Sequence, residues 1–140
     1  MMLAQWLSRY SEWSALFLRL AVGAIFIAHG RQKLFGGLAG FGQYLESLGV
    51  PLPGLFAILV ALVEFLGGIC LLLGLFTRWA ALLIAMVMLV AILRVHLPHG
   101  LTGAGGFEFP LALLAAALSL ALTGPQKLSL ERSVLNRELS

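Results

Sequence analysis

Seven polar side chains lie in or beside long apolar segments of this sequence, where they could act together on a bound molecule. In chain order they are His29, Gln32, Lys33, Glu64, Arg94, His96 and Glu108. Imidazole and ammonium groups can donate hydrogen bonds to a carbonyl oxygen, and a carboxylate can take up and release a proton. The set therefore predicts a ligand-binding site, with Glu64 as the candidate proton relay.

The first apolar segment carries three of these side chains close together. His29 and Lys33 are four residues apart and share one helix face, with Gln32 beside them. Gly23 and Gly30 lie near that face and would let another helix approach closely. Arg31 is about 200° from His29 at 100° per residue, so we expect it to reach the lipid headgroups instead.

Glu64 lies near the middle of the second apolar segment. A carboxylate facing lipid there would cost several kcal/mol, so we expect it to face other helices and to have a partner. Ala57, Ala61 and Gly68 share its helix face, and such small residues favour close helix packing. Glu64 is therefore expected to lie in the interior, below the other candidates.

The third and fourth apolar segments bring further polar groups to the same half of the membrane. Arg94 and His96 close the third segment, and Glu108 opens the fourth, where the helix dipole favours an acid. Because successive spans reverse direction, these residues should converge with His29 and Lys33. Such convergence is what a pocket between helices requires.

Other interpretations of the same residues stay open. The pairs could serve only to fix helix packing, and Lys33, Arg94 and Glu108 lie near helix ends, where anchoring alone would explain them. His29 and His96 could also ligate a metal with an acid, but no close ligand spacing supports a metal site.

Composition places the chain in a membrane. The 140 residues are 61% hydrophobic and only 11% charged, with a mean hydropathy of +1.01, whereas roughly 25% charged residues is usual for soluble domains. A net charge of +3 from scattered basic residues disfavours nucleic acid as a partner. The single cysteine, Cys70, excludes an intrachain disulfide and dithiol exchange. No haem, flavin or iron–sulfur motif is present.

The pattern predicts an all-α polytopic membrane protein with a single four-helix domain. An amphipathic stripe from Leu3 to Phe17, rich in tryptophan, predicts an interfacial helix over residues 1–14. Spanning helices are predicted at 15–34, 54–76, 78–97 and 108–123, with a tail at 124–140. A surface helix is expected near 38–48. Six cations fall on the side of the termini and three on the other, which favours cytoplasmic termini.

Several segments together resemble the DoxX family of small bacterial inner-membrane proteins. They are "LRLAVGAIFIAHGRQKLFG", "LGVPLPG", "EFLGGICLLLGLFTR", the histidine that ends the third helix, the glycine-rich approach to Glu108, and "GPQKLSLE". The family's first-helix pattern matches at Arg19, His29, Gly30 and Lys33, and its acid-then-two-glycines pattern matches at Glu64, Gly67 and Gly68. In the last motif Gln126 stands where the pattern has a glycine, and Glu131 stands where it has an aspartate.

The resemblance implies a four-helix bundle in the bacterial inner membrane and a link to redox or oxidative-stress chemistry. The leading hypothesis is therefore a quinone- or redox-associated subunit that receives electrons from a partner protein and need not itself be catalytic. In that case His29, Lys33 and His96 would donate hydrogen bonds to a quinone. The alternatives are a carrier or channel for a small solute, and a scaffold for a partner enzyme, either of which could be a homo-oligomer.

Overall fold

The computed structural model describes residues 1–136, and this part of the chain is helical with no strand. The α-helices are α1 (Met2–Ser8), α2 (Ser14–Gln32), α3 (Leu38–Ser47), α4 (Pro53–Leu73), α5 (Thr77–Ala91), α6 (Glu108–Thr123) and α7 (Leu130–Ser133). Two π-helical segments, Lys33–Gly37 and Ile92–His96, extend α2 and α5, and short 3-10 turns occupy Ser11–Trp13 and Leu97–His99. Residues 137–140 of the predicted tail lie outside the described residues.

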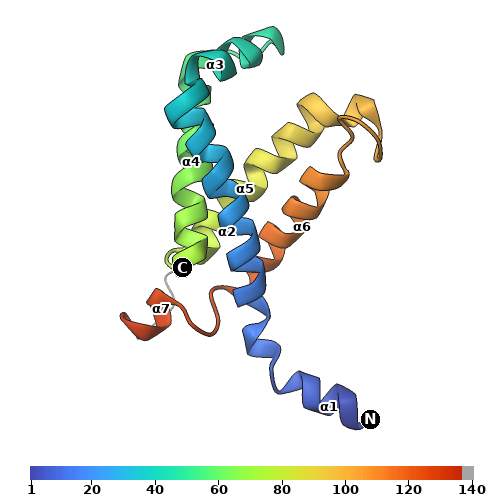
Figure 1. Cartoon of the computed structure of the whole chain (residues 1–140), viewed down its shortest axis with the longest axis vertical. Helices are drawn as coiled ribbons and strands as arrows, with labels where there is room; N and C mark the ends of the chain where they lie inside the picture. The colour runs from blue at the N-terminus through green and yellow to red at the C-terminus, as the bar shows by residue number, and fades with distance from the viewer. Residues whose placement is uncertain (137–140) are drawn as a thin grey trace.

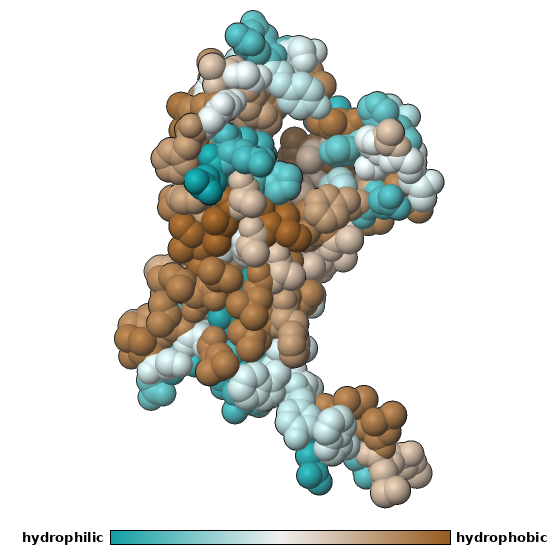
Figure 2. All heavy atoms as spheres, viewed as in Figure 1, coloured by the Kyte–Doolittle hydropathy of each residue, from teal (hydrophilic) through white to brown (hydrophobic). Residues whose placement is uncertain are grey.

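Three helical stretches are long and apolar enough to cross a membrane: Ser11–Ser47, Pro53–Leu73 and Thr77–His99. The predicted fourth span is the shorter apolar helix α6, of 16 residues. At 1.5 Å per residue α6 reaches only about 24 Å, less than the roughly 30 Å of a hydrocarbon core. Hydrophobic residues nevertheless cover the middle of the bundle, and polar residues gather towards its ends (Figure 2). The protein is thus a helical membrane protein with three clear spans.

The helices form two antiparallel pairs that diverge towards one end. In Figure 1, α2 runs beside α4, and α5 runs beside α6. A tight turn joins α4 to α5, with Gly74 and Phe76 both at positive φ. This turn lies at the same end of the bundle as α7, which we call the α7 end. The other end, where α3 lies across the top of the view, is called the α3 end.

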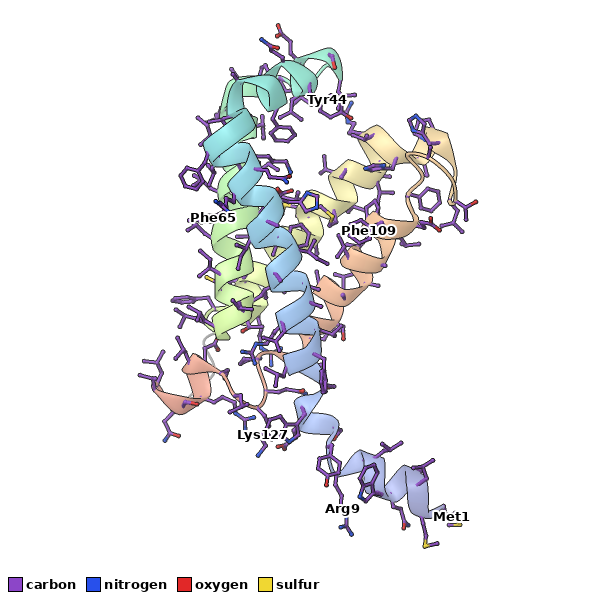
Figure 3. All side chains as sticks on the ribbon, viewed as in Figure 1. Met1, Arg9, Tyr44, Phe65, Phe109 and Lys127 are labelled. Carbon is purple, nitrogen blue, oxygen red and sulfur yellow. The ribbon has the colours of Figure 1, made fainter. Side chains whose placement is uncertain are left out.

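The N-terminal interfacial helix is shorter than the predicted helix over residues 1–14. Helix α1 ends at Ser8, and a 3-10 turn separates it from α2. The Ser8 hydroxyl donates a hydrogen bond to the Gln5 carbonyl, an interaction that competes with helix continuation. None of the α1 residues is buried, and the helix projects beyond the bundle, with Met1 at its tip (Figures 1 and 3).

Helices α2 and α4 touch through glycine, as the sequence predicts. A Cβ atom on Gly30 would lie 2.4 Å from the Phe65 backbone nitrogen, and one on Gly68 would lie 2.7 Å from the Ile27 nitrogen. A Cβ atom on Gly23 would lie 2.9 Å from the Gly68 carbonyl oxygen. Since these neighbours are backbone atoms, any larger residue would force the two helices apart.

Arg19 fixes the α7 end. Its side chain is 1% exposed, although it carries a charge. Nε donates to the Leu71 carbonyl and Nη2 to that of Leu72, both in the last turn of α4, where helix carbonyls lack intrahelical partners. The other acceptors are carbonyls of residues 125, 127 and 128. All five N–H groups of a guanidinium are thereby used. Arg19 therefore acts as the partner of another helix end.

The tail beside Arg19 contains both departures from the family pattern, Gln126 in the loop after α6 and Glu131 in α7. Gln126 takes the left-handed conformation (φ 53°), which a glycine would adopt at less cost. Its side-chain oxygen accepts hydrogen bonds from the Ala15 N–H and the Ser14 hydroxyl, at the start of α2. Glu131 is buried and accepts from the Thr77 N–H at the start of α5. The turn therefore forms with both substitutions in place. Lys127, labelled in Figure 3, also pairs with Glu12 at 3.2 Å.

We predict that Gly30→Ala separates α2 from α4 and destabilises the protein by about 1–3 kcal/mol, the usual cost of overpacking. Thermal unfolding in detergent measures the effect. Gly40→Ala is the matched control, because nothing lies within 4 Å of a Cβ added there. An equal melting temperature for the two variants would contradict the close contact.

We also predict that Arg19→Lys destabilises the α7 end, although the charge is kept. An ammonium group has three donors, so at least two of the five carbonyls would lose their partner, at about 1–3 kcal/mol each. The exposed Arg9→Lys change should leave the melting temperature unaltered. A wild-type melting temperature for Arg19→Lys would show that charge alone matters at this position.

Candidate functional site

A cavity of about 550 Å³ lies between the two helix pairs, near the α3 end. Residues from α2, α3, α4, α5, α6 and both π segments line it, and most of them are apolar. The divergence of the pairs creates this space. A ligand cavity of this size and character typically orients its occupant through a few polar groups.

Two of the polar residues that line the cavity, Lys33 and Glu64, form an ion pair. Lys33 Nζ lies 2.5 Å from Glu64 Oε2. The Glu64 side chain is 3% exposed, whereas that of Lys33 is 23% exposed. Glu64 thus has the interior position and the partner that its depth requires. Because Lys33 keeps some exposure to the cavity, it can donate to a bound molecule as well.

The π segments place the pair and its neighbours. Lys33 is the first residue of the segment Lys33–Gly37, whose wider turn follows directly on α2. Lys33 Nζ also lies 4.8 Å from the centre of the Phe41 ring, within the range of a cation–π contact. The second π segment supplies Arg94 and His96. Single π turns of this kind occur frequently at functional sites.

His96 lines the cavity in one definite orientation. Its Nδ1 lies 2.9 Å from the Gly105 carbonyl oxygen, which can only accept, so Nδ1 carries a proton. Nε2 of the neutral ring is then an acceptor. Nε2 is therefore the ring nitrogen left for a ligand: it accepts a hydrogen bond when the ring is neutral and donates one when the ring is protonated.

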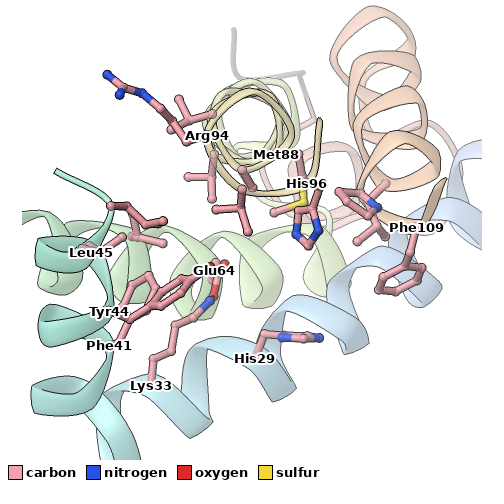
Figure 4. A pocket seen from close by; sticks show the side chains of 18 of the residues that line it. His29, Lys33, Phe41, Tyr44, Leu45, Glu64, Met88, Arg94, His96 and Phe109 are labelled. Atoms are coloured by element: carbon pink, nitrogen blue, oxygen red, sulfur yellow. The ribbon is translucent and has the colours of Figure 1, made fainter. Parts of the chain in front are cut away.

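The other predicted residues differ in position. His29 lines the cavity from α2 and is exposed. Arg94 also contributes to the lining, but in Figure 4 its guanidinium points away from the Lys33–Glu64 pair. Gln32 and Glu108 are exposed and are not among the lining residues. The structure therefore brings five of the seven candidates to one cavity. Within residues 1–136 no group of three or more His, Cys, Asp or Glu side chains is placed to hold a metal ion.

Sequence reasoning missed one wall of the cavity. Helix α3 contributes Phe41, Tyr44 and Leu45, and Leu48 follows at its C-cap, at helical spacings of three and four. The sequence predicted this surface helix and its mixed pattern, but an apolar stripe faces lipid and a cavity equally well. The available signal was the aromatic pair on that stripe.

Comparison with known proteins agrees with this architecture. The family model for DoxX matches residues 14–97, which contain α2 to α5 and the Lys33–Glu64 pair. The chain is 37% identical over 120 residues to "Putative oxidoreductase CatD" of Bacillus subtilis, covering 86% of each chain. It is 37% identical over 123 residues to "Inner membrane protein YphA" of Escherichia coli, covering 84% of this chain and 87% of that protein.

A third relative is "Uncharacterized membrane protein Rv3486" of Mycobacterium tuberculosis, 36% identical over 136 residues, covering 89% of this chain and 83% of that protein. No solved structure matches the chain significantly. The family model covers more than half of the sequence, and each of these relatives is matched over most of its length. The chain belongs to the DoxX family of membrane proteins.

Proposed function

We propose that this chain is a bacterial inner-membrane subunit that binds a quinone-type molecule in its cavity and serves a redox partner, with the α7 end in the cytoplasm. The observation that carries the proposal is the Lys33–Glu64 pair, an ionisable acid and base at the wall of a largely apolar cavity. A quinone combines an apolar body with carbonyl oxygens that need donors. The names of two relatives, an oxidoreductase and an inner-membrane protein, support the same conclusion.

Each polar residue then has a defined task. Lys33 donates a hydrogen bond to a quinone carbonyl, and Glu64 relays a proton to the oxygen of the reduced quinone. Neutral His96 accepts from a second hydroxyl through Nε2. Because the sequence holds no redox-group motif, the two electrons that reduce the quinone come from a partner protein outside this chain.

The ion pair also stabilises the folded protein. Removing one member of a buried pair leaves an uncompensated charge, which typically costs about 3–5 kcal/mol. Replacing both members by neutral groups removes that penalty. A double substitution therefore separates stability from ligand binding, which no single substitution can do.

We predict that Glu64→Gln and Lys33→Met each weaken quinone binding about 10- to 100-fold, the value of one or two hydrogen bonds to a charged group. The double variant should recover thermal stability but not binding. The measurement is retention of decylubiquinone by the protein in lipid nanodiscs, with empty nanodiscs subtracted. Gln32→Ala is the matched control, because Gln32 is next to Lys33 but outside the cavity.

Two results would contradict the proposal. One is wild-type protein that retains no quinone, either added or carried from its native membrane. The other is a double variant that binds as wild type does, which would leave the pair with a role in packing alone.

A further inference from the structure

Helix α3 forms one wall of the cavity with its apolar face. Phe41 and Tyr44 lie on this face, while Gln43, Glu46 and Ser47 are exposed on the helix. The helix packs on α4 and on the π segment that begins at Lys33. It therefore brings aromatic side chains directly beside the ion pair.

The two rings flank the place where a ligand head would sit. In Figure 4 the side chains of Phe41 and Tyr44 extend from α3 towards the end of Lys33 and towards Glu64. Within residues 1–136 the Tyr44 hydroxyl makes no hydrogen bond, and it belongs to a lining residue, so it is free to donate to an occupant. A flat ring bound at Lys33 would lie against these aromatic faces, an arrangement that favours a ring over a plain chain.

The cavity also has an edge between α3 and α5. Tyr44 on α3 is 44% exposed and Val90 on α5 is 53% exposed, although both line the cavity. The outer surface near this edge is apolar, with Met86 and Leu89 exposed on α5 and Leu93 exposed on the π segment that follows it. In a bilayer such a surface faces lipid tails. An apolar chain that leaves the cavity beside Val90 would therefore meet lipid tails.

We infer that the cavity selects a ring-bearing amphiphile: Phe41 and Tyr44 receive the ring beside Lys33, and the apolar chain leaves between α3 and α5 at Val90. This inference rests on the proposed function and specifies its substrate class as a lipid-tailed aromatic or quinonoid compound. A water-soluble ring or a plain fatty acid meets only half of these contacts.

Nanodisc binding of three probes tests the inference: decylubiquinone, the same head group without a chain, and decanoic acid. Decylubiquinone should bind most tightly at equal mole fraction in the bilayer. Tyr44→Phe should weaken binding of both ring compounds about 2- to 10-fold through the lost hydroxyl, and Tyr44→Leu should weaken it further. Gln43→Ala, on the exposed face of α3, should have no effect.

The chain exit is tested with Val90→Trp, which places a large ring in the opening. Binding of decylubiquinone should fall about 5- to 100-fold, as overpacking predicts, while binding of the chainless head group stays unchanged. Leu89→Trp is the control, since Leu89 is exposed on the same helix but is not a lining residue.

The outcomes separate this inference from the proposed function. Quinone binding that depends on Lys33 and Glu64, but is unaffected by Tyr44 and Val90 substitutions, would overturn the inference alone. Decanoic acid that competes as well as the quinone would also overturn it. Absence of quinone binding in the wild type would overturn both.

Discussion

The close approach of α2 and α4 is the constraint on which the rest of the structure depends. Gly30 lies against the backbone of Phe65, so the two helices are separated by little more than their own main chains. Lys33 is three residues beyond Gly30, and Glu64 is the residue before Phe65. The same contact that packs the helices therefore brings the ammonium group to the carboxylate. A carboxylate at this depth needs such a partner, and a wider helix separation would leave it without one. The close helix contact therefore determines both the packing of α2 on α4 and the position of the ion pair.

The two ends of the bundle differ because their backbone groups are satisfied differently. At the α7 end, Arg19 binds carbonyls from α4 and from the tail loop, and Glu131 binds the first N–H of α5. These contacts hold α2, α4, α5 and the tail together. At the α3 end, within residues 1–136, no comparable set of hydrogen bonds joins the helix pairs, and the π segments lead the chain into α3 and into the loop after α5. The cavity lies at this end because only here do the pairs diverge.

Sequence alone predicted the parts that depend on short-range spacing. His29 and Lys33 share a face, glycine marks the helix contact, and Glu64 must point inwards, and the structure has all three features. The acceptors of Arg19 could not be predicted, because three of them lie more than a hundred residues away in the sequence. They reach the guanidinium only when the tail folds back against α2. Gln32 was included in the predicted site because it precedes Lys33 in the sequence. Adjacent side chains on a helix point about 100° apart, so Gln32 does not line the cavity with Lys33. Glu108 was chosen for its position at a helix start, which fixes its depth but not the direction of its side chain.

The charges around the cavity favour one of the functional alternatives over another. A carrier for an anionic solute would need an excess of positive charge facing its path. Here the charge of Lys33 is balanced by Glu64, and the Arg94 guanidinium points away from the pair. The cavity therefore offers donors and acceptors inside apolar walls, and the charges of its ion pair balance each other. This combination is compatible with the proposed quinone-type ligand, whose oxygens can both donate and accept.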